Sequence, residues 1–151
     1  MENWRGRRDS DSRSPPWQGG ALSQAEISRE EVAFVNAHGT ATKDNDKVEG
    51  RVLKKVFGKD LKFLSTKGFT GHTLGAAGGL EAVFSALSLQ AGWIPESVGF
   101  NEEDEEIGIS PVRQRTEIKG RYAVSTSLAF GGNNSALVIF RDRLWTYQGL
   151  V

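Results

Sequence analysis

Residues 74–91 read LGAAGGLEAVFSALSLQA, a stretch with 11 apolar residues among its 18. Its clearest polar residues, Glu81, Ser85 and Ser88, fall at i, i+4 and i+7, so the spacing predicts a helix with one narrow polar stripe. At ~1.5 Å per residue this helix would span about 27 Å, and the carboxylate at its middle makes a membrane span unfavourable. A helix that is apolar on nearly every side is expected to be largely buried between two layers of structure.

The segments on either side of this helix predict an α/β fold with a mixed sheet. In chain order the expected elements are a strand at 31–37, a helix at 43–57, a strand at 61–66, the helix at 74–91, and strands at 122–130 and 135–140. This βαβαββ order implies parallel strands with right-handed crossovers, completed by a tight hairpin. Because these strands form only one sheet of about four or five strands, the helix lacks its second layer, and the chain is expected to be half of a larger fold.

The helix at 43–57 is expected to bury one face against the sheet. Its apolar residues fall at helical spacing, and they are Val48, Val52, Leu53 and Val56. The polar remainder, expected to face solvent, includes Asp44, Lys47, Glu49 and Lys54. Residues 93–120 are expected to be irregular, with the acidic run at 102–106 as a solvated loop.

Composition indicates one soluble domain. The 151 residues hold 19 Lys and Arg against 19 Asp and Glu, so the charge balance favours neither a nucleic acid nor a membrane as partner. The sequence has no cysteine, which excludes disulfide bonds, thiolate metal sites and a cysteine nucleophile within this chain. Residues 1–20, rich in arginine, serine and proline, are expected to form a disordered extension without a secretory signal, which favours a cytoplasmic location.

Three polar groups follow the ends of predicted strands, at 36–42, 65–72 and 130–134. Carboxyl ends of parallel strands open onto one crevice, so these groups are expected to share a site. The only two histidines of the sequence, His38 and His72, fall in the first two groups, together with Lys67. Taken singly, a histidine at a strand end is more often simply hydrogen-bonded than catalytic. The shared placement favours a common site.

Metal and nucleotide sites are disfavoured. Two histidines without cysteine and with poor carboxylate spacing make a weak zinc site, so no metal is expected. Gly75, Gly78 and Gly79 do not form a phosphate-binding loop, because the required lysine and hydroxyl residue are missing.

Three motifs carry a resemblance to a known family. VNAHGTAT at 35–42, STKGFTGHTLGAAGGLEA at 65–82 and SLAFGGNNSALVIF at 127–140 resemble the three carboxyl-terminal signatures of the β-ketoacyl-acyl carrier protein synthases. These are the condensing enzymes of fatty acid and polyketide synthesis, and they have the thiolase-like fold. The resemblance runs over residues 21–143, which would be the carboxyl-terminal half of that fold, with 144–151 as a tail.

The resemblance implies roles for the candidate residues. His38 and His72 would hold the thioester carbonyl of a malonyl group and stabilise the enolate that forms as carbon dioxide leaves. Lys67 would support His72 electrostatically, and Glu81 would belong to the same charged network. These roles describe a decarboxylative condensation, so the chain is expected to belong to an acyltransferase.

The resemblance also implies substrate and partner contacts. Thr40 and Thr42 would hydrogen-bond the phosphopantetheine arm of an acyl carrier protein, and Phe130 would be a gate whose backbone N–H helps to form an acyl oxyanion hole. The arm belongs to the substrate, so no cofactor is expected. Leu128 and Asn133 depart from the family's usual phenylalanine and threonine, which leaves the details of gating and acyl preference undetermined. A homodimer is typical of the family.

The missing cysteine leaves two functional hypotheses, besides the third possibility that the gene is incomplete and the DNA upstream of Met1 encodes the cysteine-bearing half. In the first, the chain is a split or truncated synthase, inactive alone, that acts with a separate amino-terminal half carrying the nucleophile. In the second, it is a noncatalytic fragment that binds carrier protein or a full-length synthase. The two histidines and the lysine favour the first hypothesis, and the absent cysteine favours the second.

Overall fold

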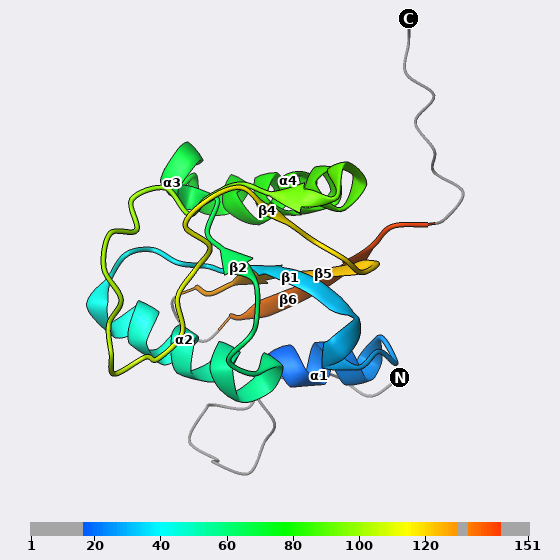
Figure 1. Cartoon of the computed structure of the whole chain (residues 1–151), viewed down its shortest axis with the longest axis horizontal. Coiled ribbons are helices and arrows are strands. Elements are labelled where there is room, and N and C mark those ends of the chain that lie inside the picture. Colours follow the sequence, from blue (N-terminus) through cyan, green and yellow to red (C-terminus); the bar gives the residue numbers. More distant parts are fainter. Residues whose placement is uncertain (1–16, 130–132, 143–151) are drawn as a thin grey trace, which may run out of the picture.

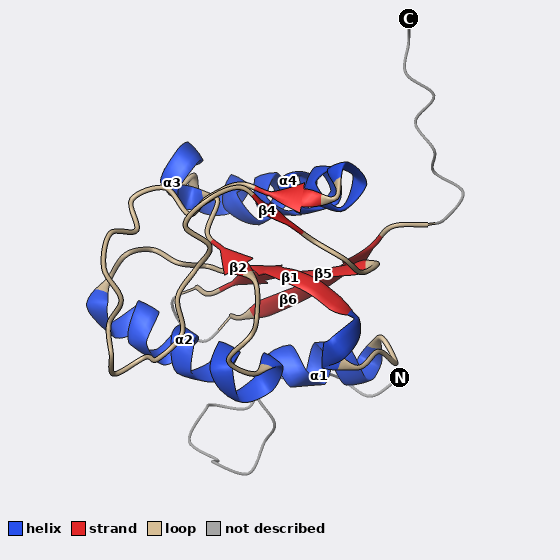
Figure 2. Cartoon of the chain, in the orientation of Figure 1, coloured by secondary structure: helices blue, strands red, loops and turns tan. Residues whose placement is uncertain are grey.

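A four-stranded mixed sheet lies between two layers of helices (Figures 1 and 2). The computed structural model describes residues 17–129 and 133–142. The strands, in their order across the sheet, are β2 (Phe63–Leu64), β1 (Val32–Asn36), β5 (Tyr122–Ser127) and β6 (Ser135–Phe140). Strand β1 is parallel to both of its neighbours, and β5 pairs with β6 in antiparallel register. The predicted α/β fold with a mixed sheet is confirmed.

Each face of the sheet is covered by its own helices. On one side lie the short helix α3 (Lys67–Thr70), the 3₁₀ turn η2 (Leu74–Ala76) and α4 (Ala77–Ala91) (Figure 1). On the other side lie α1 (Trp17–Gln24) and α2 (Lys43–Phe57), with the 3₁₀ turn η1 (Arg29–Glu31) leading into β1. The crossovers through α2 and through α3–α4 join parallel strands, as the βαβα order predicted.

Side-chain alternation along the strands builds a separate apolar core on each face of the sheet. Towards α1 and α2 the buried cluster consists of Leu22, Val35, Ala37, Leu53, Phe57, Phe63, Ile109 and Val124. Towards α4 it consists of Ala33, Phe34, Leu64, Leu89, Ile94, Ile118 and Ala123. Asn36 shares the α4 side with Phe34, so the sheet directs this amide towards the helix.

Two expectations about chain boundaries were wrong. Helix α1 begins at Trp17, inside the range 1–20 expected to be disordered, because Leu22 packs into the core and holds the helix on the sheet. Residues 93–120 were expected to be irregular, yet β3 (Trp93–Ile94) and β4 (Thr116–Glu117) pair antiparallel, since Ile94 and Ile118 bury beside α4. The acidic run at 102–106 is exposed as expected. Residues 1–16, 130–132 and the tail at 144–151 lie outside the described residues.

Helix α4 buries its polar stripe and exposes much of its apolar surface. Glu81 is 2% exposed and Ser85 is fully buried against the sheet. On the opposite side Val83 is 56% exposed and Leu87 is 52% exposed. The helix expected to be largely buried is therefore covered on one face only, because the described part of the chain supplies no second layer. Among the described residues, no helix is long and apolar enough to cross a membrane.

The buried face of α2 differs from the expected one. Glu49, expected in solvent, is 4% exposed, whereas Val48, expected in the core, is 63% exposed. The face that packs is instead Glu49, Gly50, Leu53 and Phe57. A Cβ atom on Gly50 would lie 2.3 Å from Cγ2 of Ile107, so the missing side chain lets the loop after Gly99 pack against the helix. With this close approach, the buried face of α2 lies about one residue further along the helix than the face expected from its valines.

Candidate functional site

The carboxyl ends of β1, β2 and β5 bring polar side chains from distant parts of the sequence to one edge of the sheet. His38 follows β1, Lys67 opens α3 three residues after β2 ends, and Thr126 lies near the end of β5. His72 reaches the same place from the turn between α3 and η2. The shared crevice expected from parallel topology is confirmed for the first two groups. Phe130 of the third group lies outside the described residues.

The two histidines contact each other edge to face. Their ring centroids are 5.4 Å apart and the ring planes are inclined at 86°. His72 is exposed, and its Nδ1 accepts the backbone N–H of Leu74 at 3.1 Å. An accepting nitrogen carries no proton, so in the neutral ring Nε2 of His72 is an N–H donor.

His38 is held in its neutral form. Its side chain is 7% exposed, and its Nδ1 is buried without a hydrogen-bond partner among the described residues. Burial lowers the pKa of His38 to about 4, with smaller contributions first from the ammonium group of Lys67 and then from the neighbouring His72. At neutral pH the site therefore presents an uncharged imidazole from β1 beside the imidazole of His72.

Lys67 and Glu81 form a buried ion pair behind the histidines. The ammonium group donates to Oε1 of Glu81, and the two side chains are only 5% and 3% exposed. The hydroxyl of Ser127 donates to Oε2 of the same carboxylate at 3.4 Å. This pairing confirms the expected network between Lys67 and Glu81. The expected support of His72 by Lys67 stays a prediction, while the charge of Lys67 contributes, after burial, to the lowered pKa of His38.

Asn36 locks strand β1 to α4 and to the start of α3. Its Nδ2 lies 3.2 Å from Oγ1 of Thr66, 3.3 Å from the carbonyl oxygen of Glu81 and 3.3 Å from Oγ of Ser85. Its Oδ1 accepts the backbone N–H of Thr66 at 3.2 Å. All of these groups are buried, so the amide fixes the distance between the strand that carries His38 and the helix that carries Glu81.

Glu49 fixes the backbone at His38 and Gly39 by hydrogen bonds. Its Oε1 accepts the N–H of His38 at 2.8 Å and the hydroxyl of Thr126 at 2.9 Å, while Oε2 accepts the N–H of Gly39 at 2.9 Å. Burial raises the pKa of Glu49, and the three donated hydrogen bonds oppose that rise. Sequence reasoning missed this residue. The signal was its helical register with Leu53 and Phe57, four and eight residues further along α2.

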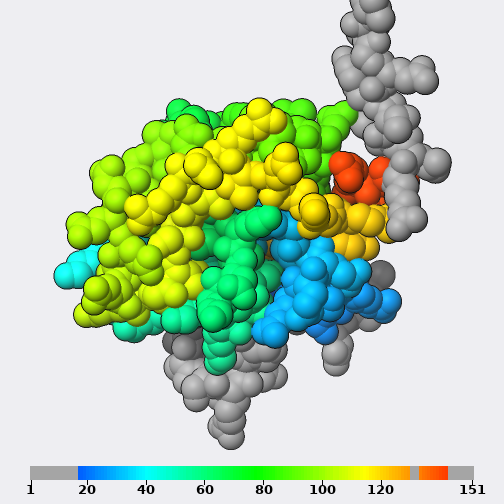
Figure 3. Space-filling model, in the orientation of Figure 1, coloured from blue at the N-terminus to red at the C-terminus, as the bar shows by residue number. Residues whose placement is uncertain are grey.

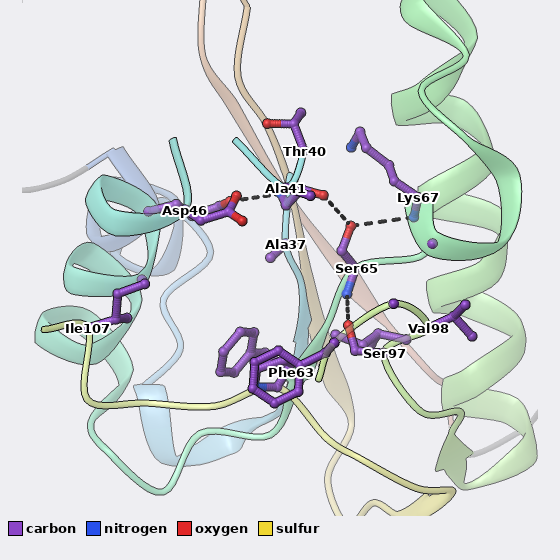
Figure 4. Close-up of a pocket in the computed structure, with 18 of the residues that line it drawn as sticks. Ala37, Thr40, Ala41, Asp46, Phe63, Ser65, Lys67, Ser97, Val98 and Ile107 are labelled. Atoms are coloured by element: carbon purple, nitrogen blue, oxygen red, sulfur yellow. Dashed lines mark hydrogen bonds between the residues drawn. The ribbon is translucent and has the colours of Figure 1, made fainter. Parts of the chain in front are cut away.

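A cavity of about 660 Å³ opens beside the histidines (Figure 4). His72, Thr40, Lys67 and Phe100 are among the residues that line it. Figure 4 shows Ser65 between Lys67 and Ser97, and its backbone N–H lies 3.3 Å from Oγ of Ser97. Oγ of Ser65 donates to the carbonyl oxygen of Gly39 at 3.1 Å. A Cβ on Gly39, whose φ is +42°, would lie 2.6 Å from Cβ of Ser65, so glycine is required there.

The predicted threonines lie near this cavity, at the start of α2. Their hydroxyls are 3.1 Å apart, and Thr40 lines the cavity. The expected contact of Thr40 and Thr42 with a substrate arm stays a prediction.

In the described part of the chain, no group of three or more His, Cys, Asp or Glu side chains is arranged to hold a metal ion.

The lowered pKa of His38 predicts a pH-dependent contribution to stability. An unfolded chain protonates this histidine near pH 6.5, whereas the folded chain does so only near pH 4. Between these values the unfolded state binds the extra proton, so the contribution of His38 to the free energy of unfolding falls as pH drops from 6.5 to 4. Urea titrations of the wild type and of His38→Asn at pH 7, 5.5 and 4.5 should show the variant gaining relative stability in acid. A constant difference would contradict the neutral, desolvated state of His38.

Comparison with known proteins places these features in one family. The family model described as "Beta-ketoacyl synthase, C-terminal domain" matches residues 13–101. The "3-oxoacyl-[acyl-carrier-protein] synthase 2" of Staphylococcus aureus is 42% identical over 122 residues, which cover 78% of this chain and 30% of that protein. This chain therefore spans about a third or less of the length of such relatives.

Solved structures show the same relationship. A β-ketoacyl synthase from Burkholderia phymatum STM815 superposes with a TM-score of 0.79 at 30% identity, covering 91% of this chain and 36% of that one. A type II polyketide ketosynthase in complex with its acyl-carrier protein superposes with a TM-score of 0.73 at 28% identity, covering 83% and 34%. These ketosynthases carry the fold that the sequence motifs implied.

Proposed function

Because this chain belongs to the β-ketoacyl synthase family and matches the model of its carboxyl-terminal domain, we propose that it supplies the decarboxylating half of a condensing site. The observation that carries the proposal is the contact between the His38 and His72 imidazoles beside a cavity. Their ring centroids lie 5.4 Å apart. His38 is neutral, and His72 presents Nε2 as a donor in its neutral form. Neutral N–H donors aimed at one point stabilise negative charge only where a reaction creates it.

In the proposed reaction the two imidazoles hold the thioester carbonyl of a malonyl group. The bond between the methylene carbon and the carboxylate breaks, carbon dioxide leaves, and the electron pair moves into the thioester as an enolate. Hydrogen bonds from His38 and His72 stabilise the enolate oxygen. The enolate carbon then attacks an acyl thioester, and the thiolate that carried the acyl group is released. The family's reaction is an acyl transfer, and this chain would provide its charge-stabilising groups.

The substrate arm would lie in the cavity beside Thr40 and Thr42. The cavity is large enough for a flexible chain, and Thr40 lines it. The arm would be the phosphopantetheine of an acyl carrier protein, and a carrier protein is bound to one ketosynthase that resembles this chain. In this proposal the reaction needs no cofactor bound to the chain itself. Phe130 would act as the gate of the acyl site. The reaction would take place in the cytoplasm.

A part of the synthase outside these 151 residues would supply the nucleophile. The sequence holds no cysteine, and the relatives extend over roughly three times the length of this chain. The uncovered face of α4 is a suitable contact for the missing part, because its exposed apolar residues are Leu80, Val83, Phe84 and Leu87. Contiguous apolar surface of this kind marks an interaction site. A homodimer of the completed assembly belongs to the same proposal.

Release of carbon dioxide from malonyl-loaded carrier protein tests the proposal. The chain is mixed with the cysteine-bearing amino-terminal half of a related synthase, and the release of labelled carbon dioxide is followed. His72→Ala should lower the rate by about a hundredfold, since one of two oxyanion donors is lost. Lys55→Ala, at an exposed position of α2, is the control and should leave the rate unchanged. Carrier binding without any carbon dioxide release would contradict the proposal and favour a noncatalytic binding fragment.

A further inference from the structure

The loop between β3 and β4 closes on itself at one edge of the sheet. The backbone N–H of Ser97 donates to the carbonyl oxygen of Val112 at 2.8 Å, and the N–H of Val112 donates to the carbonyl oxygen of Phe63 in β2 at 2.9 Å. Residues 97–112, called the wall loop, therefore have both ends fixed to the sheet. In Figure 3 the yellow-green and yellow part of the chain, which includes this loop, lies on the face shown. Compact surface loops with joined ends are frequently functional.

The wall loop forms one side of the cavity beside the histidines. Figure 1 shows it as the yellow-green segment that runs past the edge of the sheet from α3 to α2. His72, Lys67 and Thr40 line the same cavity, so the position of the loop sets the width of the space beside them. The loop residues that line the cavity are both apolar and acidic, and among them are Val98, Phe100, Glu102, Asp104, Ile107 and Ile109.

Two glycines separate the outer part of the wall loop from its fixed base. Gly99 has a φ of +89° and Gly108 a φ of +66°, in the left-handed region that glycine enters without steric cost. Between them, the backbone N–H groups of Glu106 and Ile107 donate to Oδ1 and to the carbonyl oxygen of Asp104, at 2.9 Å each. Within the described parts of the chain, no backbone hydrogen bond joins residues 100–107 to another element. These residues, called the tip, thus form a unit with a glycine hinge at each end.

Two contacts hold the tip on α2. The carboxylate of Glu106 pairs with Lys47, and Nη2 of Arg51 lies 3.9 Å from the same carboxylate. The Glu106 side chain is 63% exposed, so water and salt weaken both interactions. Beside it, Ile107 packs against Gly50 of the same helix (Figure 4). The tip is therefore attached to α2 more weakly than the base of the loop is attached to the sheet.

We propose that the tip is a lid of the cavity, hinged at Gly99 and Gly108, and that Glu106 latches it to α2. The inference rests on the proposed function only for the identity of the guest, which is the thioester arm of the substrate. Release of the latch widens the cavity and admits the arm, and closure excludes water beside His72. Exclusion of water strengthens hydrogen bonds to a developing negative charge. The lid thus controls access, while the histidines carry out the chemistry.

The reactivity of a thiol under the tip tests the lid without any substrate. The sequence has no cysteine, so I107C carries a single thiol, at a half-buried position against Gly50. Its rate of modification by a disulfide reagent in the folded chain, divided by the rate in urea, reports how often the tip opens. E106Q/I107C should react about threefold faster than I107C at low salt, and high salt should remove the difference. The matched control is E105Q/I107C, at an exposed carboxylate without an ion pair among the described residues, and it should react at the rate of I107C.

A reversible disulfide tests whether the lid controls access. A Cβ atom on Gly50 would lie 3.6 Å from Cβ of Ile107, within the range of about 3.5–4.5 Å found in disulfides. G50C/I107C is oxidised in the isolated chain, the oxidant is removed, and the amino-terminal half of a related synthase is then added. Release of labelled carbon dioxide from malonyl-pantetheine, which carries the arm without a carrier protein, should fall at least about tenfold in the oxidised form and return on reduction. The cysteine-free wild-type chain, treated identically, should keep its rate.

Each outcome decides the inference separately from the proposed function. Equal thiol reactivity in E106Q/I107C and E105Q/I107C would overturn the inference. Full carbon dioxide release by the oxidised form of G50C/I107C would also overturn it, because the arm would then enter without movement of the tip. So would a loss that reduction does not restore, since the substitutions and not closure would then be its cause. If the wild type released no carbon dioxide, the proposed function would fail, while the thiol rates would still decide whether the tip opens.

Discussion

Replacing Lys67 by methionine should lower the free energy of unfolding by about 3–5 kcal/mol, which is a large part of the stability of a domain of this size. The reason is the buried ion pair with Glu81, whose carboxylate would be left in the core without its cation. The hydroxyl of Ser127, at 3.4 Å, is too weak a donor to replace an ammonium group. Urea unfolding followed by circular dichroism measures the loss.

Two matched variants test this explanation. Lys47 forms an ion pair with the exposed Glu106, so Lys47→Met should cost less than about 1 kcal/mol. The double variant K67M/E81L removes both buried charges and should recover most of the stability that Lys67→Met loses. A loss that is the same in the single and double variants would show that packing of the lysine stem, and not the unpaired charge, carries the effect.

Glu49→Ala should lower the free energy of unfolding by about 3 kcal/mol and also impair the site. The N–H of Gly39 would lose its acceptor, the hydroxyl of Thr126 would keep only the carbonyl oxygen of Asn36 at 3.4 Å, and a cavity would open beneath His38. Hydrogen bonds to a buried carboxylate contribute more than those between neutral groups, which explains the size of the effect. Chemical unfolding together with the carbon dioxide assay measures both consequences.

Its control lies on the same helix. Asp44→Ala also removes a carboxylate from α2, at an exposed position in the first turn, and should cost less than about 1 kcal/mol. Glu49→Gln keeps one oxygen acceptor at nearly the same volume and should lose less stability than Glu49→Ala. If Glu49→Ala were as mild as Asp44→Ala, the carboxylate would not be what holds the backbone of His38.

The histidine pair could be anticipated from the sequence, but its supporting residues could not. His38 and His72 stand at strand ends, and the parallel βαβα pattern brings such ends together without any side-chain detail. No sequence pattern marked Glu49 as part of the site. A glutamate on a helix is predicted to be exposed unless the buried face of that helix is known. That face was set by Ile107 filling the space above Gly50, a contact between residues 57 positions apart. The contact between Val98 and Gly68, at the base of the wall loop, also joins residues far apart in the sequence.

Periodicity and residue type alone determined the order of the four main strands and of helices α2 and α4, the mixed sheet, and the excess of apolar surface on helix 74–91. These are local properties, because a strand or helix pattern repeats within a few residues. Tertiary structure decided which face of α2 is buried, that Asn36 ties β1 to α4, and that the wall loop borders the cavity. Those outcomes depend on packing between segments far apart in the chain, where a methyl group or a missing Cβ changes which atoms can touch.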